Sequence, residues 1–130
     1  MAGFLTVFLG AALGGALRHG VGLAALRLLG AGFPHGTLAV NLAGGFAMGA
    51  VVGCWAHRGG LSQTARLFLT TGVLGGFTTF STFALDAAQL WQAGRPLATA
   101  AYVLFSVLGA IGALFAGMAL ARRLVAPRGR

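Results

Sequence analysis

Four long apolar stretches, separated by short polar or glycine- and proline-containing turns, dominate the pattern of this chain. A helix needs about 20 apolar residues to cross the hydrocarbon layer of a bilayer. The pattern therefore predicts four membrane helices, at about residues 3–29, 34–55, 62–91 and 97–120. We expect residues 1–130 to form a single transmembrane domain with no room for a second one. Because no basic segment precedes the first apolar stretch, we interpret it as a membrane helix and not as a removable signal.

The third stretch carries an unusual run of glycines and hydroxyls, at residues 70–83. Gly75 and Gly76 loosen the helical backbone in this run. Hydroxyl side chains that can bond to freed backbone groups follow at once: Thr78, Thr79, Ser81 and Thr82. Irregular backbone at membrane depth is tolerated only where protein buries it or where it lines a polar cavity. The run therefore predicts a third helix that is broken at mid-membrane and that lines a pathway or binds an ion.

Polar side chains also recur at helical spacing in the second and fourth stretches. Thr37 and Asn41 are four residues apart, as are Tyr102 and Ser106, so each pair shares one face of its helix. An asparagine inside a membrane needs hydrogen-bond partners. One alternative for Asn41 is an interhelical hydrogen bond that only holds the helices together. The other is a place in a polar pathway.

Two phenylalanines and one arginine stand out beside these pairs. Phe80 and Phe83 are three residues apart directly after the expected break, so they share a face if the chain is helical again there. For such a pair, lipid contact or core packing is the ordinary alternative. Arg18 lies inside the first apolar stretch, where a charge is costly and faces protein or water. Its alternatives are a bond to backbone carbonyls or an extended side chain that reaches the membrane interface.

Small residues recur every four positions in several of the stretches. Such stripes let helix backbones approach closely inside a membrane. The stripes that we expect to pack closely include Gly10 and Gly14, then Gly45, Gly49 and Gly53, and Gly117.

The composition agrees with a membrane protein. Hydrophobic residues make up 58% of the 130 residues, the mean hydropathy is +0.89 and only 8% are charged, against about 25% in soluble domains. The nine basic residues are all arginines and the one acid is Asp86, which gives a net charge of +8. Most arginines fall near predicted helix ends, where they can meet anionic membrane lipid. A nucleic-acid partner is not expected, because no basic amphipathic element or soluble domain would carry it.

The chemistry of the side chains argues against an enzyme. The sequence has no paired carboxylates, no cluster of cysteine and histidine for a metal, and no nucleophile with a plausible base. What remains are neutral hydroxyl and amide donors and phenyl rings, whose edges carry the positive part of the ring quadrupole. These groups suit a small, strongly hydrated anion better than a cation.

These motifs resemble the Fluc (CrcB-type) fluoride channels of bacteria. The resemblance covers essentially the whole chain and rests on Gly-Gly-Ala-Leu-Arg at 14–18, Gly-Thr-Leu-Ala-Val-Asn at 36–41, the run at 75–83, and Tyr102 with Ser106. It implies an all-α membrane protein that forms an antiparallel homodimer with two fluoride pores. It also implies a structural sodium ion at the dimer axis, held by backbone carbonyls of Gly75 and Thr78 from both subunits, as suits a hard cation.

The resemblance further implies which side chains line the pore. Arg18 matches an arginine near the pore entrance. The pore residues that the resemblance implies are Thr37, Asn41, Phe80, Ser81, Thr82, Phe83, Tyr102 and Ser106. Ala110 departs from some relatives, which continue the polar track with a hydroxyl, so the track is shorter here or is completed by another residue.

Arginine placement gives a prediction for orientation. Six arginines lie on the side of the termini and two on the other side, which favours cytoplasmic termini: Arg58, Arg66, Arg122, Arg123, Arg128 and Arg130 against Arg27 and Arg95. Fluc members that are encoded by a single gene insert both ways. Either the bias is too weak to fix the orientation, or the chain pairs with an oppositely oriented paralogue, and we favour the homodimer.

The expected function is a passive, fluoride-selective channel of the bacterial inner membrane that lets fluoride leave the cytoplasm and so relieves its toxicity. The main alternative is a small four-helix, proton-coupled multidrug exporter, for which Asp86 is the only candidate carboxylate. An arginine near the interface is a candidate partner for Asp86. A third hypothesis is a non-transporting subunit of a larger complex.

Overall fold

The computed structural model describes residues 1–58 and 61–125 of the chain, and every element in them is helical. Arg128 and Arg130 of the orientation argument lie outside the described residues. The elements in chain order are α1 (Ala2–Leu29), α2 (His35–Arg58), α3 (Gln63–Leu67), η1 (Phe68–Leu74), α4 (Gly75–Phe77), α5 (Phe80–Gln92) and α6 (Pro96–Val125). Four helical segments are long and apolar enough to cross a membrane, which confirms the predicted all-α class and the four membrane helices.

Local chemistry explains where the helices end. Gly30 closes α1 with a φ of 77°, a left-handed conformation that favours glycine, and its amide bonds to the Leu26 carbonyl at 3.0 Å. At the other end of the chain, α6 continues to Val125, beyond the expected end near Leu120. Its last turn holds Arg122 and Arg123, whose charge is favourable at a helix C-terminus.

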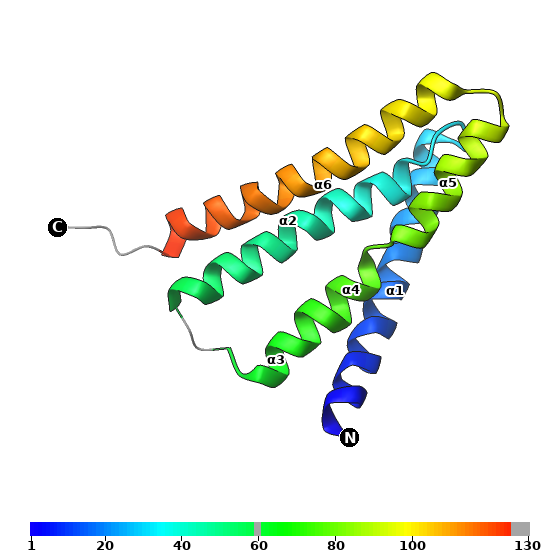
Figure 1. Cartoon of the computed structure of the whole chain (residues 1–130). Coiled ribbons are helices and arrows are strands. Elements are labelled where there is room, and N and C mark those ends of the chain that lie inside the picture. Colours follow the sequence, from blue (N-terminus) through cyan, green and yellow to red (C-terminus); the bar gives the residue numbers. More distant parts are fainter. Residues whose placement is uncertain (59–60, 126–130) are drawn as a thin grey trace.

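The third apolar segment changes its helical form along its length. After the short α3, the chain forms π-helical turns in η1 and a single α-helical turn in α4. Thr78 and Thr79 are then extended, with ψ angles of 161° and 124°, before α5 begins at Phe80. Gly75 and Gly76, which we expected to loosen the backbone, are themselves helical. Figure 1 shows the thin connection between α4 and α5.

Gly76 serves close helix packing instead, as do glycines of α1. A Cβ on Gly76 would lie 2.6 Å from the Ala11 carbonyl oxygen, and one on Gly10 would lie 2.8 Å from the Gly72 Cα. A Cβ on Gly14 would overlap the backbone of Val73. Small residues therefore join α1 to η1 and α4 with backbones almost in contact.

The second close pair consists of α2 and α6. A Cβ on Gly49 would overlap the Leu114 carbonyl oxygen, and one on Gly117 would overlap the Phe46 carbonyl oxygen. Figure 1 shows the two helices side by side along their length. In the same view this pair and the pair formed by α1 with α3 and α4 diverge from one end, where the α1–α2 and α5–α6 turns lie.

The helices bury little of their apolar surface within one chain. In the four spanning segments, only 11% to 22% of the most apolar window is buried. The buried cluster at the end with the two turns centres on Phe83, Leu90 and Tyr102. Large apolar side chains elsewhere, such as Phe105 and Phe115 of α6, are exposed. They require an apolar environment outside the chain, which membrane lipid or another protein chain supplies.

The first prediction tests the contact between α2 and α6. Gly117→Ala should lower the free energy of unfolding by about 1–3 kcal/mol, because the added methyl group forces two packed backbones apart. Gly112→Ala on the same helix is the matched control, since nothing lies within 4 Å of its added Cβ. Thermal unfolding in detergent measures both variants. Equal stability of the two would contradict the assigned contact.

Candidate functional site

Asn41 holds the two extended residues between α4 and α5. The Thr79 amide donates to Asn41 Oδ1 at 2.8 Å, and Asn41 Nδ2 donates to the Thr79 carbonyl at 3.0 Å. In a continuous α-helix, the Thr79 amide would donate to the carbonyl of Gly75, four residues earlier. The side chain of Asn41 therefore forms hydrogen bonds with both backbone groups of Thr79, as a neighbouring β-strand would. Within an apolar environment each of these groups would be costly to leave unpaired.

The hydroxyl of Thr79 begins the next helix. It accepts a hydrogen bond from the Thr82 amide at 3.1 Å, the usual role of an N-cap threonine. It also donates to Thr82 Oγ1 at 3.1 Å and lies 3.3 Å from Ser81 Oγ. Ser81 and Thr82 are exposed in the single chain. The structure thus brings these two predicted pore residues to the first turn of α5, beside the extended residues.

Two backbone carbonyls near the extended residues, those of Gly75 and Thr78, differ in their hydrogen bonds from carbonyls in a continuous helix. The Gly75 carbonyl does not receive the Thr79 amide, which bonds to Asn41. The Thr78 carbonyl accepts a long bond, 3.5 Å, from Arg18 Nη1. Arg18 lies inside α1, and its guanidinium group bonds to the backbone of Thr78 and not to carbonyls at the end of α1. This bond to a carbonyl is one of the alternatives that the sequence left open for Arg18.

Aromatic rings form a row from α5 to α6. The centroids of Phe80 and Phe83 are 5.4 Å apart, so the two rings share a face as their spacing predicts. Phe83 contacts Tyr102 at 5.4 Å, and Tyr102 meets Phe33 edge-on at 5.5 Å. Phe80 is 77% exposed, whereas Phe83 is 8% and Tyr102 0% exposed. The row thus runs from an open surface into the buried cluster.

A first cavity lies beside the extended residues and has a volume of about 440 Å³. Its lining brings together four of the predicted pore residues, Asn41, Phe80, Phe83 and Ser106, with Thr78 and Thr79. Ser106 Oγ is buried and has no hydrogen-bond partner among the described residues. A buried hydroxyl without a partner is costly, so it can bind a molecule or ion that enters this cavity.

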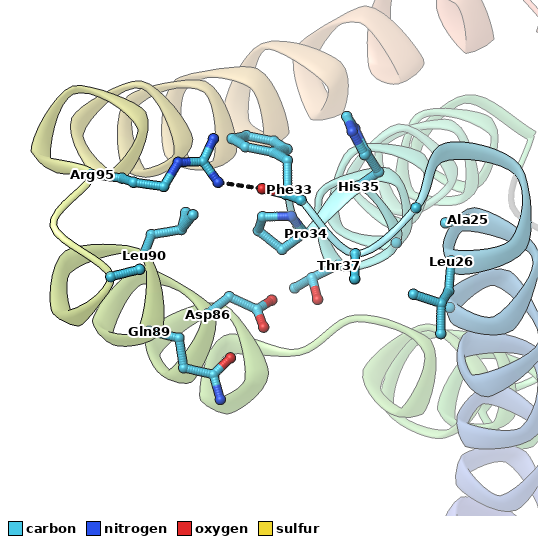
Figure 2. Close-up of a pocket in the computed structure, with 16 residues that line it drawn as sticks. Ala25, Leu26, Phe33, Pro34, His35, Thr37, Asp86, Gln89, Leu90 and Arg95 are labelled. Carbon is cyan, nitrogen blue, oxygen red and sulfur yellow. Dashed lines mark hydrogen bonds between the residues drawn. The ribbon is translucent and has the colours of Figure 1, made fainter.

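The second cavity lies at the α1–α2 turn and has a volume of about 470 Å³. Thr37 and Asp86 line it, and Figure 2 shows their side chains pointing toward one another. His35, Gln89 and Arg95 also contribute polar groups to its wall. Arg95 donates to the Gly32 carbonyl and so ties the α5–α6 turn to the α1–α2 turn (Figure 2).

Asp86 is a residue of this region whose partner the sequence did not reveal. We expected an arginine, but the hydrogen bond to Asp86 comes from the Tyr102 hydroxyl, at 3.0 Å to Oδ2. The physical reason is position: Tyr102 is fully buried, so its hydroxyl needs an acceptor inside the bundle. A signal existed in the sequence, because Asp86 follows Phe83 by three residues and so shares the face that packs on Tyr102.

Tyr102 separates the two cavities. Its ring packs on Phe83, which lines the first cavity, and its hydroxyl bonds to Asp86, which lines the second. On α2, Thr37 faces the second cavity and Asn41, one turn later, faces the first. The two cavities therefore border the same face of α2, with the Tyr102–Phe83 contact between them. The side chains along this face are neutral donors and aromatic rings, together with the carboxylate of Asp86.

The described residues offer no cluster of acids, histidines or cysteines for a metal. Within residues 1–58 and 61–125, no group of three or more such side chains lies together. A cation in this part of the chain would depend on backbone and hydroxyl oxygens, which hard cations such as sodium accept. The Gly75 carbonyl, which does not receive the Thr79 amide, fits that chemistry, whereas the Thr78 carbonyl already accepts a bond from the positively charged Arg18 side chain.

Comparison with known proteins places the chain in a family. The family model described as CrcB-like protein, Camphor Resistance (CrcB), matches residues 5–118. A protein of Methylobacterium nodulans named Fluoride-specific ion channel FluC is 57% identical, over 92% of this chain and 95% of that protein. A protein with the same name from Hyphomonas neptunium is 54% identical over 97% of this chain and its full length. In Mesorhizobium japonicum, a third is 50% identical over 95% of this chain and 99% of its own length.

The second prediction concerns the cap of α5. Thr79→Ala keeps both backbone bonds to Asn41 but removes the cap, so it should cost about 0.5–2 kcal/mol of unfolding free energy. Thr79→Ser retains the hydroxyl and should keep most of the stability. Chemical denaturation in detergent compares the two variants. If serine does not restore stability, the hydroxyl is not the group that begins α5.

Proposed function

This chain belongs to the CrcB-like family, and we propose that it is a passive, fluoride-selective channel that lets fluoride leave the cytoplasm. The chain is a multi-pass bacterial membrane protein of a channel family, which is not a class of enzymes. The relatives named as fluoride-specific channels match nearly the whole chain. That extent supports the same transported ion for this chain, in the inner membrane. A passive route suffices, because fluoride that enters as neutral HF from acidic surroundings is trapped inside as the anion.

The observation that carries this proposal is the lining of the cavity beside the extended residues. Asn41 and Ser106 offer neutral donors there, and Phe80 and Phe83 add aromatic rings, whose edges carry a partial positive charge. Ser106 Oγ lacks a partner among the described residues, so it can donate to an ion without breaking another bond. Neutral donors replace part of the hydration shell of the anion without the strong attraction of a full charge, so the anion can also leave.

The remaining predicted residues take places along the same line. Thr37 and Tyr102 continue the polar face toward the second cavity, which we propose as an aqueous entry. Ser81 and Thr82 contribute hydroxyls at the first turn of α5. Arg18 places a positive charge beside the extended residues, where it attracts anions toward the entrance of the pathway.

We further propose a structural sodium ion and an antiparallel homodimer. The carbonyls of Gly75 and Thr78 from both subunits would hold the ion where the third helix is broken, at the middle of the membrane. The Gly75 carbonyl supports this site because it does not receive the Thr79 amide, and the Thr78 carbonyl would exchange its long bond from Arg18 for the ion. The exposed ring of Phe80 and the low burial of all four spanning segments support a partner subunit that covers this side.

The alternative of a proton-coupled exporter requires Asp86 to exchange protons while it faces a substrate. Asp86 lines a cavity, as that alternative needs, but it also accepts the hydroxyl of buried Tyr102. Transport of fluoride down its own gradient, with no proton gradient present, would distinguish a channel from a proton-coupled exporter.

The third prediction is fluoride efflux from liposomes that contain the purified protein. The vesicles are loaded with potassium fluoride, and valinomycin carries the counter-charge with no proton gradient imposed. Fluoride should leave quickly and chloride slowly. Ser106→Ala removes one donor to the anion, a bond worth about 1.5–3 kcal/mol, and should slow fluoride efflux by about tenfold or more. Phe80→Ile should also slow it.

A matched control and a contradicting result complete this test. Thr6→Ala removes an exposed hydroxyl that bonds within α1, and it should leave efflux unchanged. Equal release of fluoride and chloride by the unmodified protein, or release of neither, would contradict a fluoride-selective channel.

A further inference from the structure

One side chain connects the extended residues to the cavity: Asn41. Its amide group bonds to both backbone groups of Thr79 and also lines the cavity with Phe80 and Ser106. We propose that Asn41 is the positioning residue that keeps the Gly75 carbonyl free, so that it determines sodium affinity as well as offering a donor to the anion. This inference rests on the proposed function, and its experiment separates the failure of one from the failure of the other.

The first step is a competition for one hydrogen-bond donor. The Thr79 amide can donate to the Gly75 carbonyl, as in a continuous helix, or to Asn41 Oδ1. In the structure it donates to Asn41, at 2.8 Å. The Gly75 carbonyl therefore keeps its lone pairs for another partner. Loss of the Asn41 acceptor would let the amide return to Gly75 and would occupy one of the proposed sodium ligands.

The second step concerns the choice of residue. Asn41 donates to the Thr79 carbonyl at 3.0 Å while it accepts from the Thr79 amide, so both halves of its amide group are used. Asparagine and glutamine carry a neutral donor and acceptor side by side on one planar amide group, and glutamine is longer by one methylene. Aspartate of equal size keeps the acceptor and loses the donor.

The third step is the capacity that Asn41 has left. Its side-chain nitrogen has two N–H groups, and one of them serves Thr79. The other remains for the cavity that Asn41 lines. One side chain thus has two separable parts: its oxygen keeps the Gly75 carbonyl free, and its second N–H serves the anion.

The experiment measures sodium affinity without any ion flux. Thermal unfolding of the full-length protein in detergent is followed in fluoride-free buffer as sodium replaces N-methylglucamine, and the sodium concentration that gives half of the stabilisation is recorded. Asn41→Ala should raise this midpoint by about tenfold or more, because the Thr79 amide would then occupy the Gly75 carbonyl, a proposed ligand of the ion. Asn41→Leu removes the same hydrogen bonds but keeps the branched shape of the side chain. It replaces the alanine variant in this experiment if that variant does not fold.

Variants at Asn41 and Ser106 separate the role of Asn41 in sodium binding from its role in fluoride transport. Asn41→Asp keeps the acceptor for the Thr79 amide and loses only the donor to the Thr79 carbonyl, so its sodium midpoint should stay well below that of Asn41→Leu. Its fluoride efflux should fall by about tenfold or more, because the carboxylate lacks the N–H donor and repels anions. Ser106→Ala is the matched control: it lines the same cavity, so its efflux falls while its sodium midpoint stays unchanged.

The outcomes are distinct. An unchanged sodium midpoint in Asn41→Ala or Asn41→Leu overturns the positioning role, as does a midpoint in Asn41→Asp as high as that in Asn41→Leu. A complete lack of sodium stabilisation in the unmodified protein overturns it as well. A lack of fluoride efflux in the unmodified protein, with the expected sodium midpoints, overturns the proposed channel and leaves the role of Asn41 supported.

Discussion

The need to satisfy backbone hydrogen bonds in apolar surroundings governs this structure. Thr78 and Thr79 leave the helical conformation, although the Thr78 amide still donates to the Leu74 carbonyl at 3.0 Å. The Thr78 carbonyl and both backbone groups of Thr79 need partners from elsewhere. Asn41 serves both groups of Thr79, and Arg18 reaches the Thr78 carbonyl. These partners come from α2 and α1, so the extended residues require both helices in place. Asn41 and Arg18, which stand out in the sequence, thus first of all provide the hydrogen bonds that the irregular backbone needs.

Close packing through small residues borders the cavity beside the extended residues. Glycines bring α1 against η1 and α4, and others bring α2 against α6, with backbones in near contact. The cavity lies along the second pair, since Gly45 of α2 and Ala110 of α6 both line it and a Cβ on Gly45 would lie 2.7 Å from the Ala110 carbonyl oxygen. Ser106 of α6 and Phe83 of α5 complete its wall with Thr78 and Thr79. A close helix contact and the irregular backbone thus face each other across this space.

The sequence predicts the helices and the shared faces better than it predicts partners. Apolar length identifies the four spanning segments, and a spacing of three or four residues correctly brings Phe80 beside Phe83. Periodicity says nothing about which group lies across the bundle, so it could not show that Asn41 meets the Thr79 backbone or that Asp86 meets Tyr102. Composition was also ambiguous for Gly75 and Gly76, since glycine suits both loose backbone and close packing. The structure shows both of them helical and Gly76 against Ala11.

In the proposed function, an asparagine suits a position between a cation and an anion because its amide group is neutral and has both polarities. Its oxygen accepts the Thr79 amide, so the Gly75 carbonyl does not receive that donor. Its nitrogen has a further N–H, and Asn41 lines the cavity together with Phe80 and Ser106. A carboxylate in this position would repel an anion, and an ammonium group would hold the anion too tightly. A neutral side chain of α2 can therefore leave an acceptor on α4 free for a cation and offer a donor to an anion, without adding a net charge to the membrane interior.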